Sequence, residues 1–579
     1  MLKKLLAYFK GFGKYLILGP LCVLIDVMAE LSIPLLMSRI VDVGINNLDT
    51  GYIARIGLLM VLLAVVAICL GCANMVFSAR AAQGAAAALR TDLFGRIQSF
   101  SFADIDRFST ASLVTRMTND VNQLQTTSVV SLRLLIRSPI MIVCALVMAI
   151  SINARLASIL LVVAPLLIVT VLLVMGPAQQ RFALMQKRLD DVNADVQEDL
   201  IAIRVVKAFV RETFERLKFA RVNDAYLEAG LAASRVMIIL TPVMMLLMNG
   251  SVVAALWFGG HMVGQGVLGA GLLISFISYI TQILNSLMLF AMVLMMAGRA
   301  RAAGYRVVEV LETEPSLTDS AAARTIRDGH GGVEFSHVCF KYQATQAENV
   351  LNDISFTARP GQVVALVGAT GSGKSTLTQL IPRLYDVSAG AVLVGGHDVR
   401  EWLLEDLRQH VAMVLQTSRL FSGTIRQNLL WGNAEATEEE MQRAARIAQA
   451  EEFICRLPDG FDTMLGQGGV NLSGGQKQRL CIARALLKRP AVLILDDSTS
   501  AVDSDTEAKL RSAFYAELPE TTVLMIAQRI SSVAAADTIL VLQEGCLVGS
   551  GTHRELLRDN QVYREIYDSQ QGVAEGVGA

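Results

Sequence analysis

Six long apolar segments in the first half of the chain constrain its fold more than any other feature. Hydropathy places them near residues 16–37, 56–78, 134–152, 156–178, 236–259 and 270–297. Each is roughly long enough, at about 1.5 Å of rise per helical residue, to cross about 30 Å of hydrocarbon. The composition agrees, because 53% of the 579 residues are hydrophobic and only 18% are charged. We therefore expect a membrane α-helical bundle of six transmembrane helices over residues 16–298, preceded by an amphipathic interfacial helix over residues 1–15.

The distribution of basic residues predicts the orientation of this bundle. The connecting segments 80–133 and 179–235 are long and rich in Arg and Lys, whereas residues 152–155 and 259–271 form short, nearly uncharged connections. The positive-inside rule then places both termini in the cytoplasm of a multi-pass protein. We expect this membrane to be the cytoplasmic (inner) membrane of a bacterium. The formal net charge of −1 provides no basic field, so we expect no nucleic-acid partner.

The two long basic segments are helically periodic, which predicts that spans two to five continue well beyond the membrane. Their tips would be "FSTASLVTRMTND" at 108–120 and "AFVRETFERLKF" at 208–219. Tips so far from lipid need a partner surface, and the second half of the chain is the obvious one.

Two acids lie within the first span. Asp26 and Glu30 share one helix face, and a charge at membrane depth costs at least ~2.5 kcal/mol on insertion scales. We expect them to face a water-filled substrate cavity; the alternative is local pairing or protonation near the outer boundary, where Arg39 is close. Flexible thioethers and aromatic rings in the last two spans suit an adaptable apolar pocket, although they are equally typical of a bundle core. The candidates are Met245, Phe276, Tyr279 and Met292.

After residue 298 the apolar continuity ends, which predicts a linker over 299–332, an α/β P-loop NTPase domain with a helical subdomain over 333–568 and a flexible tail over 569–579. The buried strand "VVALVG" opens into "GATGSGKST" at 368–376, which fits G-x-x-x-x-G-K-[ST] between a strand and a helix. Such a loop cradles nucleotide phosphates. The residues expected to do so are Gly368, Gly371, Gly373, Lys374, Ser375 and Thr376, with the Ser375 hydroxyl on Mg²⁺.

Two later segments extend this nucleotide site. The strand "AVLILDD" at 491–497 ends in Asp496, which can hold the Mg²⁺ shell through water. "NLSGGQKQRLCIARAL" at 471–486 is a Gly-rich turn that leads into a helix, hence a second phosphate-binding helix N-terminus. One nucleotide cannot use both helices, so a second copy of the domain must complete the site.

These motifs resemble those of ATP-binding-cassette proteins, and six spans fused to one cassette resemble an exporter-type half-transporter over nearly the whole chain. The resemblance implies ATP and Mg²⁺ as cofactors, Tyr342 stacked on adenine, and Gln416 linking Mg²⁺ to the helical subdomain. It implies that Ser473 and Gly475 contact the γ-phosphate held by the opposite cassette, and that Asp503 lies in the loop across the interface. The whole signature is Leu472, Ser473, Gly474, Gly475 and Gln476. The cytoplasmic tips would be coupling helices, the second docking on the partner's cassette.

The chain departs from the family pattern at its own ATP site. The usual general base after the strand aspartate is a glutamate, but here it is Asp497; the usual switch histidine is Gln528; and Gln467 replaces a glutamate before the signature. Asp draws its carboxylate back by ~1 Å, a displacement that can cost about 100-fold in rate. Gln528 can never become cationic. The pattern resembles the degenerate-site subunit of heterodimeric bacterial multidrug exporters.

The sequence therefore predicts one subunit of a heterodimeric ATP-driven exporter that moves amphipathic or apolar compounds, drugs or lipids, out of the cytoplasm. Its expected partners are a second, non-identical half-transporter, the lipid bilayer and a small amphipathic substrate. Two alternatives stay open: an exporter-fold importer of metal–siderophore complexes, and a nucleotide-gated channel or regulatory ATP-binding module.

Overall fold

The computed structural model describes residues 1–579 except 321–322, 324, 326–330, 343–347, 498–501 and 577–579, and it leaves out the side chains of 294, 295, 297, 299 and 571–576. The chain divides into two compact units. The first comprises Met1–Gln98 and Ala111–Thr313, and the second comprises Ser99–Thr110 and Glu314–Ala579. Parts of the predicted linker and tail therefore lie outside the described residues.

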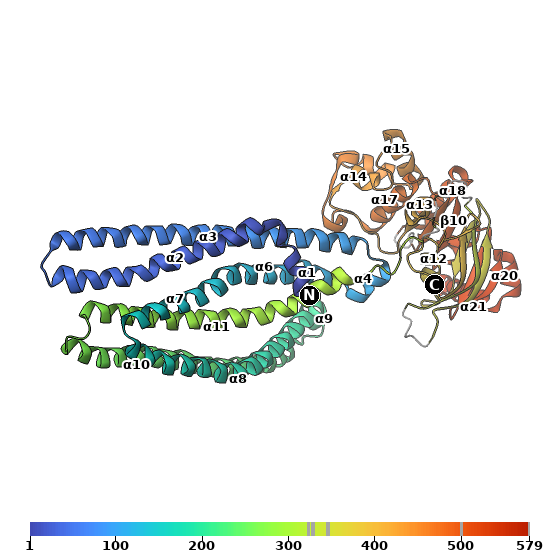
Figure 1. Cartoon of the computed structure of the whole chain (residues 1–579). Coiled ribbons are helices and arrows are strands. Elements are labelled where there is room, and N and C mark those ends of the chain that lie inside the picture. The colour runs from blue at the N-terminus through green and yellow to red at the C-terminus, as the bar shows by residue number, and fades with distance from the viewer. Residues whose placement is uncertain (321–322, 324, 326–330, 343–347, 498–501, 577–579) are drawn as a thin grey trace. The chain divides into compact units, whose positions relative to one another are not determined.

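The first unit is a bundle of long helices arranged side by side (Figure 1). In chain order, all its helical elements, short and long, are α1 (Leu2–Ala7), η1 (Lys10–Phe12), α2 (Gly13–Arg39), η2 (Ile40–Ile45), α3 (Thr50–Gln98), α5 (Thr110–Thr115), η3 (Arg116–Asp120), α6 (Val121–Val130), η4 (Ser131–Leu135), α7 (Ile136–Ile152), α8 (Ala154–Ile201), α9 (Ile203–Ala208), α10 (Glu212–Gly264) and α11 (Ala270–Glu312). Within the described residues, 6 helical stretches are long and apolar enough to cross a membrane. The predicted six-span bundle is confirmed.

Side-chain caps fix where the short connections turn. Asn153 ends α7 and accepts hydrogen bonds from the backbone N–H groups of Arg155 (2.9 Å) and Leu156 (3.1 Å), which starts α8. Asp42 accepts hydrogen bonds from the N–H groups of Gly271 (2.7 Å) and Leu272 (3.1 Å) in the first turn of α11. A carboxylate at a helix N-terminus satisfies donors that the helix itself cannot, so this contact also ties the end of the first span to the last.

Both predicted cytoplasmic tips are placed too far along the chain. The first turn is built around α4 (Phe102–Phe108), because Ser101 and Asp104 form a capping box that starts this helix. Ser109, at φ 58°, then ends it, and helix resumes at Thr110. The second tip is α9, followed by a turn with Val210 at φ 52° before α10. Most of 108–120 and 208–219 belongs to the returning helices.

Among its described residues, the second unit contains three sheets. Their strands are β1 (Val333–Phe340), β2 (Leu351–Ala358), β3 (Val363–Val367), β4 (Ala389–Val394), β5 (His397–Asp398), β6 (Val411–Val414), β7 (Gly423–Thr424), β8 (Met464–Leu465), β9 (Val492–Asp496), β10 (Thr522–Ile526), β11 (Thr538–Gln543) and β12 (Cys546–Gly551). One sheet has the order β2-β1-β4-β5, another β12-β11-β3-β10-β9-β6, and β7 pairs with β8. The α/β cassette expected from the sequence is confirmed.

Helices cover the larger sheet and form the subdomain between β6 and β9. They are α12 (Lys374–Leu380), α13 (Leu404–His410), α14 (Ile425–Leu430), α15 (Glu438–Ile447), α16 (Glu451–Cys455), η5 (Gly460–Asp462), η6 (Gln467–Gly469), α17 (Gly474–Leu487), α18 (Ser504–Glu517), α19 (Ile530–Val533), α20 (His553–Asp559) and α21 (Gln561–Gly576). The strands β3 and β9 are buried along their whole length, as expected for a parallel sheet covered on both faces.

The element bounds differ from the predicted segment bounds at two places. Helix α11 continues to Glu312, through the first part of the segment predicted as a linker, and β1 begins at Val333. Helix α21 covers most of the segment predicted as a flexible tail.

Candidate functional site

The parallel order of the large sheet brings the predicted ATP-site residues to one edge. Strands β3, β10, β9 and β6 are neighbours and all parallel, so their carboxyl ends meet at the same side. The loop after β3 is the P-loop, and the turns after the other strands carry Gln528, Asp497 and Gln416. Residues far apart in sequence thus converge for a topological reason.

The P-loop requires glycine where its backbone passes closest to other atoms. Gly368 lies at φ 157° and Gly373 at φ 94°, both in the region that disfavours side chains. A Cβ on Gly373 would come within 2.7 Å of a Leu351 methyl carbon. Both positions therefore require glycine, and α12 starts directly after the loop at Lys374.

Lys374 is folded over this loop. Its ammonium donates to the carbonyl oxygens of Gly368 (2.9 Å) and Ala369 (2.8 Å). Burial lowers the pKa of Lys374, and the nearby Asp496 and Asp497 act in the opposite direction. The ammonium is thus held at the phosphate cradle with carbonyl partners that a nucleotide's phosphate oxygens can replace.

Ser375 and Asp496 form the oxygen pair expected for a divalent cation. The Ser375 hydroxyl donates to Asp496 Oδ1 at 2.8 Å, and burial raises the pKa of Asp496. Hard cations such as Mg²⁺ prefer oxygen ligands, and two such oxygens already lie side by side here. The residues fit a Mg²⁺ ion bound with ATP, which would be held by Ser375 and Asp496 and, through its amide oxygen, by Gln416. The ion would supply neutralisation of phosphate charge.

Asp497 is enclosed by two amides. One of its carboxylate oxygens, Oδ2, accepts a hydrogen bond from Gln528 Nε2 at 2.7 Å and a longer one from Gln416 Nε2 at 3.5 Å. Burial raises the pKa of Asp497, while both amides lower it by stabilising the charged form. The backbone of Asp497 is left-handed, at φ 47°. Of the three residues predicted as catalytic, Gln416 and Gln528 therefore both contact Asp497.

Gln570 is a contact residue of this site that the sequence reasoning missed. Its side chain, on α21, accepts a hydrogen bond from the Ile530 N–H (2.8 Å) and donates one to the Gln528 carbonyl oxygen (2.8 Å). Both bonds bracket the turn that carries Gln528. A glutamine in the segment 568–571 carries no sequence signal for this contact, which arises from the packing of α21.

The predicted adenine-stacking residue belongs to an aromatic cluster that reaches α4. Tyr342 packs edge-on against Tyr385, with ring centroids 5.1 Å apart, and its hydroxyl lies 2.9 Å from Thr376 Oγ1. Tyr385 in turn contacts the Phe102 ring at 6.2 Å and donates its hydroxyl hydrogen to Asp106 at 2.8 Å. Tyr385, also missed by the sequence reasoning, therefore joins the nucleotide edge of the cassette to α4 within the same unit.

The signature residues are organised by their own helix. Ser473 is the N-cap of α17, and its hydroxyl accepts from the Gln476 N–H while the Gln476 side chain accepts from the Ser473 N–H (2.9 Å). Ser473 and Gly474 are exposed, whereas Leu472 is buried beneath them. Asp503 is likewise exposed and caps α18 through the Thr506 N–H (2.9 Å). A helix N-terminus presented to solvent in this way can bind the phosphate of a nucleotide held elsewhere.

The membrane acids are paired, though not with Arg39. Arg137, on α7, forms ion pairs with Glu30 and with Asp26 (3.6 Å). The acids therefore pair with a basic residue of the third span and not with Arg39, the partner named in the alternative to the cavity role; the cavity role itself stays a prediction. Phe276 and Tyr279 are fully buried, and the Tyr279 hydroxyl donates to the Leu31 carbonyl oxygen at 2.7 Å, so both pack the bundle core.

Two family models match the chain. The model described as ABC transporter transmembrane region covers residues 16–287, and the model described as ABC transporter covers residues 351–500. These two matches fall on the bundle and on the cassette, and together they cover most of the chain.

Relatives match over nearly the same extent. The uncharacterized ABC transporter ATP-binding protein YfiB of Bacillus subtilis (strain 168) is 41% identical over 572 residues, or 99% of this chain and 99% of that protein. An ATP-dependent lipid A-core flippase of Syntrophus aciditrophicus (strain SB) is 33% identical over 493 residues, or 85% of this chain and 82% of that protein. The solved structure of a bacterial Atm1-family ABC exporter with ATP bound is 27% identical, with a TM-score of 0.81 over 96% of this chain and 98% of that chain.

Proposed function

The chain belongs to the ABC transporter family as an exporter-type half-transporter, and we propose that it forms the hydrolysis-impaired subunit of a heterodimeric exporter. Its partner is a second, non-identical half-transporter, and its cargo is an amphipathic or apolar compound such as a drug or lipid. The complex lies in the cytoplasmic membrane with the cassettes and both termini in the cytoplasm.

The observation that carries this proposal is the contact between Asp497 and Gln528. A general base must reach the attacking water, and a positioning error of about 1 Å can cost about 100-fold in rate. Asp497 has the shorter of the two acidic side chains, and its Oδ2 is already occupied by the Gln528 amide at 2.7 Å. A general base whose side chain is too short, and whose carboxylate oxygen already accepts a hydrogen bond, activates water poorly.

Gln528 limits the site in a second way. Its amide donates hydrogen bonds but carries no charge at any pH. It therefore holds Asp497 in place without supplying the positive charge that would stabilise a phosphoryl transition state. ATP bound at this P-loop is expected to stay bound for long periods.

The signature segment of this chain, Leu472–Gln476, does not share the impairment of the chain's own ATP site. Ser473 caps a helix of 14 residues and is exposed, so it can complete the ATP site of a second cassette. Hydrolysis in the dimer then occurs mainly at the site built from the partner's P-loop and this chain's Leu472–Gln476 segment. The long-lived nucleotide on this chain keeps the two cassettes in partial contact between cycles.

An amphipathic cargo is supported by the relatives and by the bundle. Proteins 33% and 34% identical to this chain are named lipid A-core flippases. Met245 and Met292, at 59% and 52% exposed, present flexible thioethers that suit apolar ligands of varied shape. Arg137 neutralises part of the charge of Asp26 and Glu30, so these acids form a polar cluster rather than a bare anionic site.

The experiment compares steady-state ATP hydrolysis by the purified heterodimer with one change at a time. Asp497→Asn is expected to leave most of the activity, because this site contributes little turnover. Replacing the partner's catalytic glutamate with glutamine is expected to abolish it. Lys374→Ala, which removes phosphate binding from this chain, serves as the control that the nucleotide itself is required.

Two results would overturn the proposal. One is an equal loss of activity for Asp497→Asn and for the partner's glutamate variant, which would make both sites catalytic. The other is a fully active homodimer of this chain, because two copies would then contain only the impaired site.

A further inference from the structure

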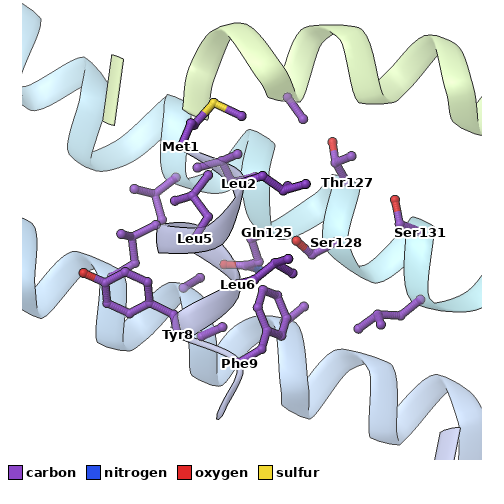
Figure 2. A pocket seen from close by; sticks show the side chains of 18 of the residues that line it. Met1, Leu2, Leu5, Leu6, Tyr8, Phe9, Gln125, Thr127, Ser128 and Ser131 are labelled. Atoms are coloured by element: carbon purple, nitrogen blue, oxygen red, sulfur yellow. The ribbon is translucent and has the colours of Figure 1, made fainter. Parts of the chain in front are cut away.

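A cavity of about 850 Å³ lies between the N-terminal segment and the helices α3, α6 and α11, all within the first unit (Figure 2). This volume falls in the range of pockets that bind small ligands, about 300–1,000 Å³. None of the residues that line it belongs to the ATP site or to the acid cluster around Arg137. The cavity therefore needs an explanation of its own.

Two side-chain contacts hold the N-terminal segment over this cavity. Lys4 forms an ion pair with Glu312 at 2.6 Å, and the Tyr8 hydroxyl donates to Asp92 at 2.9 Å. Glycine permits the close approach: a Cβ on Gly304 would lie 3.1 Å from a methyl carbon of Leu5. These contacts hold helix α1 over the cavity, so the cavity is a feature of the folded first unit.

The lining is apolar with a polar side. Leu6 and Phe9 project toward Gln125 and Ser128 on α6 (Figure 2). The other apolar lining residues come from the inner faces of the helices and include Leu2, Leu5, Leu16, Leu89, Leu124 and Leu132. Leu2 and Leu6 are 64% and 55% exposed, so α1 leaves apolar surface that the protein itself does not cover.

The charged residues among the described lining are both cationic. They are Lys10 and Arg301, and no acid lines the cavity among the residues described. An apolar chamber whose lining includes two cations is complementary to a molecule with a hydrocarbon tail and an anionic head. Basic pockets on the cytoplasmic side of membrane helices bind lipid head groups in this way.

The lining residues lie where the apolar runs of three membrane helices begin or end. Leu16 begins the apolar run of α2 two residues after Lys14, and Leu132 and Leu135 lie at the start of the third span. Arg80 marks the end of the apolar part of α3, next to the lining residue Ala82. Lipid head groups occupy this level, so the most abundant amphiphiles near the opening are phospholipids of the inner leaflet.

We propose that this cavity binds one anionic phospholipid of the cytoplasmic leaflet. An acyl chain lies between α1 and α6, against Leu6, Phe9 and Ser128, and the phosphate lies near Lys10 and Arg301. The lipid fills the space under α1 and joins this segment to α3, α6 and α11. The site is separate from the transport pathway and does not depend on which subunit hydrolyses ATP.

The test uses the intact transporter in membrane vesicles with two photoactivatable lipids. Both carry a diazirine on the acyl chain, but one is phosphatidylglycerol and the other is phosphatidylcholine. Two cations near the surface, at about 1 kcal/mol each, predict a roughly 30-fold preference for the anionic lipid in labelling of peptides from α1 and α6. Equal labelling by the two lipids would overturn the proposal.

A matched pair of variants tests the cavity itself. Ser128→Phe fills the space from α6 and is expected to abolish labelling of α1. Thr126→Phe adds the same bulk on the exposed side of the same helix and is expected to leave labelling unchanged. Equal labelling in the two variants contradicts a site in the cavity; unchanged thermal unfolding of both excludes misfolding as the cause.

A second pair tests the head-group contact. Lys10→Gln combined with Arg301→Gln is expected to remove the preference for phosphatidylglycerol while phosphatidylcholine still labels weakly. Lys14→Gln, an exposed cation outside the lining, is the control and is expected to retain the preference. Displacement of the lipid probe by an excess of transported dye would assign the cavity to the cargo and overturn the proposal.

Discussion

At the scale of single residues, Asp497 and Gln528 act as a pair. The turn after β9 holds Asp497 at φ 47°, a conformation that Asp and Asn tolerate better than most residues, and Gln528 donates to its carboxylate. A change at only one of these two residues leaves the deficiency at the other residue in place. A longer acid alone still lacks a switchable cation, and a histidine alone still faces a short acid.

We therefore predict that Asp497→Glu with Gln528→His raises hydrolysis at this chain's own site. The measurement uses a heterodimer whose partner glutamate is replaced by glutamine, so that the other site is silent. The double variant should recover about tenfold of the roughly 100-fold attributed to misplacement. Either single change should recover less; a single change that matches the double variant would show that the two residues act independently.

A second residue-scale prediction concerns Arg137. This side chain is the cation that compensates Asp26 and Glu30. Arg137→Met should leave two acids without it, each costing at least ~2.5 kcal/mol at membrane depth if it stays charged. We expect a lower yield of folded transporter, measured by the monodisperse fraction after extraction.

Restoration provides the control for that prediction. Adding Asp26→Asn and Glu30→Gln to Arg137→Met should recover the folded yield, because no charge is then left unpaired. If the triple variant also transports a cationic and a neutral dye at wild-type rates, the acids play no part in cargo selection. A folded yield for Arg137→Met equal to that of the wild type would contradict the pairing argument.

At the scale of elements, polar side chains of α4 contact the cassette. Ser101 and Asp104 both contact Ser316, where the Ser316 N–H donates to Asp104 at 3.0 Å, and Tyr385 contacts Asp106. Burial raises the pKa of Asp104, but the hydrogen bonds from Ser316 and Ser101 outweigh it and the pKa is lowered. These contacts keep Asp104 in its charged form.

We predict that Tyr385→Phe weakens the link between ATP hydrolysis and transport. The change removes the hydroxyl donor to Asp106 but keeps the ring that packs on Tyr342 and Phe102. A hydrogen bond to a charged group contributes about 1.5–3 kcal/mol, so the transport rate per ATP hydrolysed should fall several-fold while ATP affinity stays unchanged. The control is Tyr515→Phe, whose hydroxyl donates to the Ala535 carbonyl oxygen at 2.7 Å, remote from α4.

The elements also show which features the sequence could predict. Apolar run length and the Gly-Lys-Ser loop depend on local residue types, so the six spans and the P-loop were predictable. The tips at α4 and α9 were placed too late, because helical periodicity continues through a turn that is set by one capping box, at Ser101, and by isolated left-handed residues. Tyr385, Arg137 and Gln570 carry no local signal, since each acts through a contact with a distant segment.

At the scale of the whole molecule, the proposal gives one chain parts of two different sites. Its P-loop serves one nucleotide, and its signature helix α17 has an exposed N-terminus that, in this proposal, serves another. A single cassette cannot place both around the same phosphates, so the functional unit is a dimer. Variants in this chain therefore divide into those that affect its own nucleotide and those that affect its partner's.

Ser473→Ala separates these two classes. We predict that it reduces hydrolysis by the heterodimer about 100-fold or more, because the lost hydroxyl contacts the transition state at the partner's active site.

The change also removes an N-cap worth about 1 kcal/mol, so helix stability must be controlled. Thr437→Ala removes an equivalent capping box from α15 in the same subdomain and should leave turnover nearly unchanged. Since the P-loop of this chain is intact in Ser473→Ala, trapped ATP on Lys374 and Ser375 should persist. Unchanged turnover in Ser473→Ala, or a loss equal to that of Thr437→Ala, would show that this signature does not complete the partner's catalytic site.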